Sequence, residues 1–288
     1  MWTEIAAQIS QVTGKTFRIE QRHPVGGGCI NQGYRLQAEG QNYFIKLNQA
    51  DQLTMFESEV IALQQMAATQ TIQVPKPICW GVNERHSYLV LSWLNLGKGN
   101  ATSWRSLGRQ LARMHSQGQN QRFGWERNNT IGSTPQINTW SEHWADFFAE
   151  HRIGYQLKLA QRRGGHFPDT IKMVTKVRNL LAAHNPQPAL VHGDLWSGNA
   201  AILESGEPVI FDPATYYGDR EVDLAMTELF GGFPTAFYQG YTEVSPLAEG
   251  YQQRKILYNL YHILNHFNLF GGSYAAQANQ MINQLFNR

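Results

Sequence analysis

The chain has 288 residues, of which 42% are hydrophobic, and its 24 Lys and Arg residues against 22 Asp and Glu residues give a net charge of +2. The length predicts a globular protein of one large or two modest domains, and the hydrophobic fraction excludes a disordered or collagen-like chain. Because the charges form no block of one sign, we expect no nucleic-acid partner.

Neither membrane segments nor a disulfide framework are expected. The longest apolar run, residues 88–96, is shorter than the roughly 20 residues of a membrane helix and is interrupted by Ser92 and Asn95. The first residues lack the basic and apolar regions of a signal peptide. Two cysteines, Cys29 and Cys79, fit a reducing compartment. We therefore expect a cytoplasmic protein without a membrane partner.

The first ninety-odd residues alternate short β-type runs with turn signals. Apolar side chains at helical spacing predict one helix over residues 51–69, with Asp51 as its N-cap. The pattern therefore indicates a small antiparallel β-sheet lobe, residues 1–94, with one helix. Strands are predicted over residues 16–21, 34–38, 43–47, 78–82 and 87–94.

The remainder, residues 95–288, follows a linker-like stretch and is mainly helical in period. One β-hairpin, residues 200–203 and 208–211, interrupts this pattern. We therefore expect an α+β protein with two lobes, of which the second is larger and mainly helical. Helical spacing marks residues 107–114, 140–148, 170–183 and 254–270.

Three polar side chains flank this hairpin. Asp194 and Asn199 lie five residues apart on the loop that leads into it, and Asp212 follows the returning strand. A tight hairpin brings Asn199 and Asp212 together at its open end, where an amide oxygen and a carboxylate suit Mg²⁺. Asp194 lies outside that pair and is free to accept a proton. This spacing is that of a kinase catalytic loop, which predicts a protein-kinase-like bilobal fold that uses ATP.

A cluster of glycines, Gly26, Gly27 and Gly28, lies in a bend between two predicted strands. Without Cβ atoms in the way, the backbone N–H groups of such a bend can face phosphate oxygens. Gly-rich hairpin turns are also common without any ligand, so this pattern alone leaves both interpretations open.

Lys46 lies on the third predicted strand, where a kinase places the lysine that binds the α- and β-phosphates. Glu59, on the following helix, is its predicted partner, and Glu57 is an alternative that the sequence does not exclude. Taken alone, these residues would be interpreted as a solvated lysine and a surface glutamate. Together with the catalytic loop, they favour a nucleotide site. The junction of the two lobes is the segment where a kinase offers backbone groups to adenine: Ser92, Trp93 and Leu94.

Other residues near these motifs have more than one interpretation. Trp196 is either a core aromatic residue or a platform for the substrate. His192 is expected to pack inward, and Asp223 to accept hydrogen bonds from the catalytic-loop backbone. His262 and His266 lie four residues apart on a predicted helix, which could suggest zinc, but no clear third ligand accompanies them. We expect them to be core or pocket-lining histidines.

These motifs resemble those of the fructosamine-kinase family, also called ketosamine-3-kinases, in the aminoglycoside-phosphotransferase-like branch of the kinase fold. The resemblance covers essentially the whole chain. The His-Gly-Asp core is shared by the wider superfamily, whereas Leu195-Trp196-Ser197 and residues 231–234 narrow the choice to ketosamine kinases. The matching segments are residues 26–30, 135–140, 192–199, 212–214, 217–225, 230–234 and 265–268.

The resemblance implies ATP-dependent phosphorylation of the 3-hydroxyl of a ketosamine, a sugar attached to an amine such as a protein lysine, and hence deglycation. On this basis Asp194 is the base, and Asn199 and Asp212 hold Mg²⁺. Lys46, paired with Glu59, neutralises phosphate charge. The sequence does not choose among fructosamine, ribulosamine and erythrulosamine substrates.

Two alternatives remain at this stage. One is a kinase of another small aminated or hydroxylated molecule, of the aminoglycoside or choline type. The other is a pseudokinase, which is disfavoured because Lys46, Asp194, Asn199 and Asp212 are all present.

Cys29, in the glycine bend, is either a small loop residue or a redox-sensitive thiol. The resemblance implies that a cysteine at this position can form an intersubunit disulfide. The protein is therefore expected to be a monomer or a homodimer whose assembly depends on redox conditions.

Overall fold

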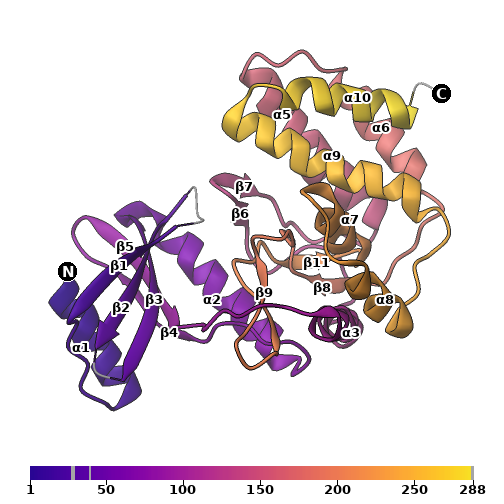
Figure 1. Ribbon diagram of the computed structural model, residues 1–288. Coiled ribbons are helices and arrows are strands. Elements are labelled where there is room, and N and C mark those ends of the chain that lie inside the picture. The colour runs from indigo at the N-terminus through magenta and orange to yellow at the C-terminus, as the bar shows by residue number, and fades with distance from the viewer. Residues whose placement is uncertain (27–29, 39, 287–288) are drawn as a thin grey trace.

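The computed structural model describes residues 1–26, 30–38 and 40–286, and its N-terminal part is built on a five-stranded antiparallel sheet (Figure 1). The strand order is β1-β2-β3-β5-β4, so the third strand in the chain lies at the centre of the sheet. The strands are β1 (Gln21–Val25), β2 (Gln32–Ala38), β3 (Gln41–Gln49), β4 (Pro77–Val82) and β5 (His86–Ser92).

One helix packs on each face of this sheet. Helix α1 (Trp2–Thr13) places Ile5 and Ile9 against side chains such as Ile45 and Val90. Helix α2 (Leu53–Ala68) packs against the alternate side chains of β5, Leu89 and Leu91. Because successive side chains of a strand point to opposite faces, this arrangement buries the sheet on both sides.

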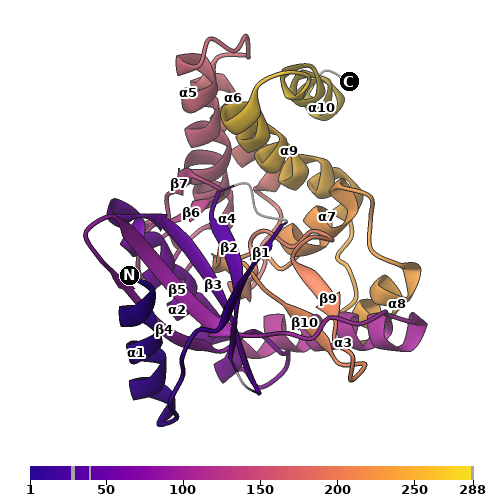
Figure 2. The same ribbon diagram turned by 60° about the vertical axis from the view of Figure 1, so that its left-hand side comes forward.

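The remainder of the chain is mainly helical, as predicted, and Figures 1 and 2 show α9 and α10 at one end and α3 beside α8 at the other. Two hydrophobic clusters hold this part together, and aromatic side chains such as Trp144, Phe148 and Tyr258 fill the larger one. The α-helices are α3 (Ala101–Gln117), α4 (Trp144–Phe147), α5 (Tyr155–Arg162), α6 (Thr170–Leu181), α7 (Glu221–Leu229), α8 (Thr235–Val244), α9 (Tyr251–Phe270) and α10 (Tyr274–Phe286), and a π-helix, Phe148–Gly154, connects α4 to α5.

Short strand pairs connect these helices and carry the loops of the site. The predicted hairpin is present as β9 (Ala200–Ile202) and β10 (Pro208–Ile210), and in Figure 2 it lies beside the sheet. An isolated bridge between Gln73 and Val209 joins this hairpin to the N-terminal part, and another, between Leu96 and Leu203, joins it to the segment that follows the sheet. The other pairs are β6 (Asn129–Ile131) with β7 (Thr134–Gln136), and β8 (Ala189–Val191) with β11 (Tyr216–Gly218).

The structure corrects four details of the sequence prediction. Helix α1 was not expected, and the first strand is β1 rather than residues 16–21. The N-terminus of α2 follows a short 3₁₀ turn, so its N-cap is Gln52 and not Asp51. Trp140 precedes α4 and stacks on Tyr217 with ring centroids 6.1 Å apart, so it does not share a helical face with Trp144.

None of the helices in the described part of the chain is long and apolar enough to cross a bilayer.

Candidate active site

Lys46 lies at the centre of the sheet and joins it to α2 and to the segment after β10. It projects from the face of β3 opposite α1, because Ile45 and Leu47 fill the α1 side. Its ammonium contacts both carboxylate oxygens of Glu59, at 2.8 and 3.0 Å, and Asp212 Oδ1 at 2.6 Å. The structure therefore places Glu59 beside Lys46. Glu57 is partly exposed, and no ion pair links it to Lys46 in the described part of the chain.

This ion-pair cluster is buried, since Lys46 is 6% and Glu59 7% exposed. Burial alone would lower the pKa of Lys46, but the Asp212 and Glu59 carboxylates raise it above its ordinary value. The side chain is therefore a fixed positive charge near neutral pH. Such a charge, held by a carboxylate from α2, is suited to binding phosphate oxygens.

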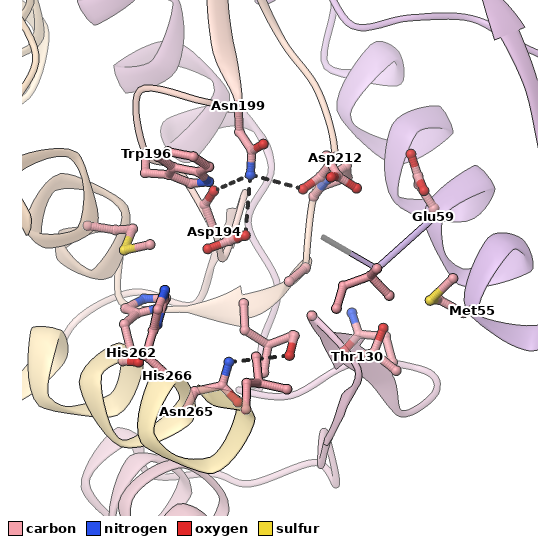
Figure 3. Close-up of a pocket in the computed structure, with 18 of the residues that line it drawn as sticks. Met55, Glu59, Thr130, Asp194, Trp196, Asn199, Asp212, His262, Asn265 and His266 are labelled. Atoms are coloured by element: carbon pink, nitrogen blue, oxygen red, sulfur yellow. Dashed lines mark hydrogen bonds between the residues drawn. The ribbon is translucent and has the colours of Figure 1, made fainter. Parts of the chain in front are cut away.

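Asp194 and Asn199 lie on one loop, between β8 and β9, as Figure 3 shows. The Asn199 amide nitrogen donates to the Asp194 backbone oxygen at 2.8 Å and to Asp194 Oδ2 at 3.3 Å. It also reaches the Asp212 backbone oxygen at 3.5 Å. Because the hairpin returns beside its start, Phe211 N donates to Asn199 O at 3.0 Å. The structure therefore brings together the three polar side chains that the sequence singles out at this hairpin.

Asp212 has a left-handed backbone, with φ of 60°, which is uncommon for a residue other than glycine. Its side chain is 52% exposed and lines two cavities. Burial in the cleft would raise the pKa of Asp212, but the Lys46 ammonium lowers it below the ordinary value. Asp212 is therefore an ionised carboxylate that is open to a ligand on one side and held by Lys46 on the other.

Asp194 has the opposite electrostatic environment. Burial and the nearby Asp212 carboxylate raise the pKa of Asp194 to about 8, and the hydrogen bond from Asn199 only partly opposes this. A carboxyl group with a raised pKa is a better proton acceptor than an ordinary aspartate when it is ionised. The pKa of Asp194 is thus raised while that of Asp212 is lowered.

Buried side chains hold the backbone of the loop that carries Asp194. Asp223 on α7 accepts hydrogen bonds from His192 N at 2.7 Å and Gly193 N at 2.8 Å, as the sequence predicts. It also pairs with His115 Nε2 at 3.0 Å. His192 is fully buried and donates through Nε2 to the Phe211 backbone oxygen at 3.0 Å. This histidine therefore braces the loop and does not face the cavities.

Gly193 occupies a position that no other residue fits, since its φ is +81° and a Cβ atom would lie 2.1 Å from the Ala214 backbone oxygen. We predict that Gly193→Ala lowers the free energy of unfolding by about 2–4 kcal/mol and reduces kcat, because Asp194 is the next residue. Urea unfolding and steady-state kinetics measure both effects. Gly206→Ala is the control, because Gly206 has a φ of +88° but open space around it. Equal losses in the two variants would contradict a steric role for Gly193.

One cavity, of about 330 Å³, lies between the sheet and the β9–β10 hairpin and is lined by Lys46, Gly26, Ser92, Trp93 and Leu94. The side chains of Ser92 and Trp93 are engaged locally: Ser92 Oγ accepts from Lys76 N, and the Trp93 indole donates to Asn95 Oδ1. Gly27, Gly28 and Cys29 lie outside the described residues, so their predicted roles stay predictions.

A second cavity, of about 410 Å³, adjoins the first, and Asn199, Asp212 and Glu59 line both. Asp194 and Trp196 line this second cavity, and the Trp196 ring lies 6.4 Å from that of Phe230 in an edge-to-face arrangement. Trp196 thus faces the cavity and is not a core residue.

Several residues of this cavity were not assigned there from sequence. They come from the β6–β7 hairpin, from α7 and from α9 and α10, and some belong to segments that the family resemblance quotes without a role. These residues are Asn129, Thr130, Ile131, Gly132, Met226, Phe230, Asn265, Leu269, Phe270 and Tyr274.

Sequence comparisons agree with this geometry. A family model described as fructosamine kinase matches residues 1–288. A Synechocystis protein named "Probable ketoamine kinase" is 65% identical over 283 residues, which cover 98% of this chain and 96% of the relative. The chloroplastic protein-ribulosamine 3-kinase of Arabidopsis thaliana is 43% identical over 274 residues, or 93% of this chain and 83% of the relative.

Solved structures give the same result for the fold. A Haemophilus somnus protein assigned as a fructosamine-3-kinase has a TM-score of 0.94 at 33% identity, with 99% of this chain and 98% of that chain covered. The aminoglycoside phosphotransferase APH(4)-Ia has a TM-score of 0.64 at 14% identity, covering 99% and 98% of the two chains. This second similarity concerns the fold alone. Together they confirm the predicted kinase-like fold.

Proposed function

Because this chain belongs to the fructosamine kinase family, we propose that it transfers the γ-phosphoryl group of ATP to the 3-hydroxyl of a ketosamine. The observation that carries this proposal is the meeting of two cavities at Asp212 and Asn199, with Lys46 in one and Asp194 in the other. A phosphoryl donor in the first cavity and a hydroxyl acceptor in the second would meet at these residues. In the proposed division of the chain, residues 1–94 bind the nucleotide and residues 95–288 supply the catalytic loop and the acceptor site.

ATP is assigned to the cavity bordered by Ser92, Trp93 and Leu94. There the backbone of this segment would bind the base, and the Lys46 ammonium would bind phosphate oxygens. Gly26 lines the same cavity, and the rest of its glycine cluster is assigned to the phosphates on the sequence pattern alone. Glu59 holds Lys46 in place.

The residues at the junction fit Mg²⁺. Asp212 offers a carboxylate that is about half exposed. The Asn199 amide nitrogen donates to Asp194, whereas the amide oxygen accepts no hydrogen bond from the described residues and is available to an ion. Hard oxygen donors of this kind are typical magnesium ligands. When bound, the ion neutralises charge on the transferring phosphoryl group.

Asp194 acts as the base in the proposed reaction. The oxygen of the 3-hydroxyl forms a bond to the γ-phosphorus, the bond from that phosphorus to the bridging oxygen of ADP breaks, and the hydroxyl proton passes to Asp194. Trp196 provides an aromatic wall beside the acceptor. Since the transition state is highly charged, the fixed positions of Lys46 and Asp194 supply much of the acceleration.

The proposal is tested by ADP formation with ribulosyl-, erythrulosyl- and fructosyl-lysine, and with an aminoglycoside and choline as comparison acceptors. We expect Mg²⁺-dependent ADP formation with at least one ketosamine, matched by an equal amount of 3-phosphorylated product. Transfer to the aminoglycoside or choline alone would favour the other small-molecule kinase. Nucleotide binding without transfer to any acceptor would favour a pseudokinase.

A further inference from the structure

Helix α9 places an imidazole that has no hydrogen-bond partner at the second cavity, the one proposed to hold the acceptor and called the acceptor cavity below. His262 is 4% exposed and lines the 410 Å³ cavity together with Asp194 and Trp196. Its Nδ1 is fully buried and unpartnered, whereas Nε2 is not among the fully buried atoms and has no hydrogen bond to a residue that the structure describes, so Nε2 is the nitrogen open to the cavity. Buried polar atoms without partners are rare because their desolvation is not compensated. A group of this kind facing a cavity is a candidate for binding a ligand.

Two neighbouring polar side chains of α9 in the cavity, Asn265 and His266, differ from His262 because each has a hydrogen-bond partner. Asn265 donates to the Ile131 backbone oxygen and accepts from Gln156, each at 3.3 Å. His266 Nδ1 donates to the His262 backbone oxygen at 2.8 Å. Figure 3 shows these three side chains on the same helix, on the side of the cavity facing Asp194 and Trp196. Among these three side chains, His262 is therefore the one with no hydrogen bond to a described residue.

The His262 ring is neutral near physiological pH. Burial, and then the nearby His266, lower the pKa of His262 to about 3. A neutral imidazole has one N–H donor and one lone pair. A sugar hydroxyl, which both donates and accepts, matches Nε2 in either tautomer of the ring, whereas an ammonium or a phosphate would each match only one tautomer.

We propose that His262 binds a hydroxyl of the ketose chain other than the one phosphorylated, and so orients the 3-hydroxyl toward Asp194. This inference rests on the proposed function, because it assumes a polyhydroxy acceptor in the cavity. His262 would then select acceptors that carry a hydroxyl at the contacted carbon. The adjacent Phe230 ring cannot make this distinction because it has no hydrogen-bonding group, and the Trp196 indole N–H can donate but cannot accept.

The test combines His262→Leu and His262→Gln with ribulosyl-lysine and with analogues that each lack one hydroxyl other than the 3-hydroxyl. We expect His262→Leu to lower kcat/KM for ribulosyl-lysine by about tenfold to a hundredfold, and His262→Gln to recover part of it. With the analogue that lacks the hydroxyl bound by His262, the kcat/KM of the parent protein should fall by a similar factor. His262→Leu should lower kcat/KM no further with that analogue. ADP affinity should be unchanged.

Asn259→Leu is the matched control. Asn259 lies on the same helix, is 7% exposed and also has an unpartnered oxygen, but it is not among the described residues that line the cavity. We expect unchanged kcat/KM for this variant. His262→Leu should have a Tm at least equal to that of the parent, because a buried unpartnered group is removed, whereas a structural histidine would lower the Tm when replaced.

The outcomes separate this inference from the proposed function. If the parent phosphorylates ribulosyl-lysine and His262→Leu does so equally well, the His262 contact is overturned and the kinase assignment stands. If His262→Leu lowered kcat/KM by the same factor with every deoxy analogue, the proposed His262 contact would also be overturned. If the parent transfers phosphate to no ketosamine, the proposed function fails and the inference fails with it.

Discussion

Asp194→Asn is expected to reduce kcat for phosphoryl transfer by about 10²–10⁴-fold while leaving nucleotide affinity nearly unchanged. The amide has the shape of the carboxyl group and can still accept a hydrogen bond from the Asn199 nitrogen, which lies 3.3 Å from Asp194 Oδ2. It cannot take up the hydroxyl proton, and general-base catalysis contributes a factor of about that size. Product formation and equilibrium ADP binding measure the two quantities. Activity equal to that of the parent would show that Asp194 is not the base.

The same substitution should stabilise the protein free of nucleotide and metal. Burial and Asp212 raise the pKa of Asp194 to about 8 in the folded state, whereas an unfolded chain has an aspartate pKa of about 3.9. Between these values the unfolded state releases a proton that the folded state retains, so the stability of the parent falls as pH rises from about 4 to about 8. The amide that replaces the carboxyl group has no such proton to release.

The gain in the free energy of unfolding should therefore be near zero at pH 4 and should widen to roughly 2 kcal/mol by pH 8, after allowing for water in the open cleft. Urea unfolding in the presence of a chelator measures it. A gap that is constant with pH would contradict a raised pKa. Low activity and higher stability in one variant would mean that the fold accepts strain at Asp194 for the sake of catalysis.

The catalytic loop was predictable because its geometry is local in sequence. Asn199 and Asp212 flank a hairpin whose pairing register, Ala200 with Ile210, forces them together. The partner of Lys46 could not be decided from the sequence, because Glu57 and Glu59 were both possible. It is decided by the rotation of α2, which turns Phe56, Val60 and Leu63 toward the sheet and leaves Glu59 facing Lys46 on β3.

The β1 region was not predictable from its pattern. Residues 16–21 alternate as a strand should, but Phe17 is 2% exposed because it packs against α1, outside the strand ladder. The actual strand, β1, contains Pro24 and is mostly exposed, as an edge strand can be. Its structure comes from pairing with β2, a contact with another segment that the composition of β1 does not reveal.

The acceptor cavity shows the same limit on a larger scale. Its walls come from several separated parts of the chain: residues 30–31, α2, the β6–β7 hairpin, the loop before β9, the segment after β10, α7 and the α9–α10 pair. His262 could be recognised as pocket-lining or core from its spacing with His266, but not distinguished between the two. Only the missing hydrogen-bond partners of His262 identify it as a candidate ligand-binding group.

Lys46→Met is expected to abolish most of the activity and to destabilise the protein by about 3–5 kcal/mol in the absence of nucleotide and metal. Lys46 is the cation between two carboxylates, at 2.8 Å from Glu59 Oε1 and 2.6 Å from Asp212 Oδ1. Removing one partner of a buried ion pair leaves an uncompensated charge, which has about this cost. The loss in kcat should be about a hundredfold or more, because the charge proposed to bind the phosphate oxygens is removed.

The double variant Lys46→Met/Glu59→Gln separates the two effects. Glu59 is 7% exposed, and burial raises the pKa of Glu59 above its ordinary value even beside the ammonium. Replacing it by a neutral amide removes the stranded charge, so the double variant should regain at least half of the lost unfolding free energy and none of the activity. Glu57→Gln, on the same helix, should change neither quantity. If the double variant were as unstable as Lys46→Met, the charge of Glu59 would not be what Lys46 compensates, and the loss would have to come from packing or from Asp212.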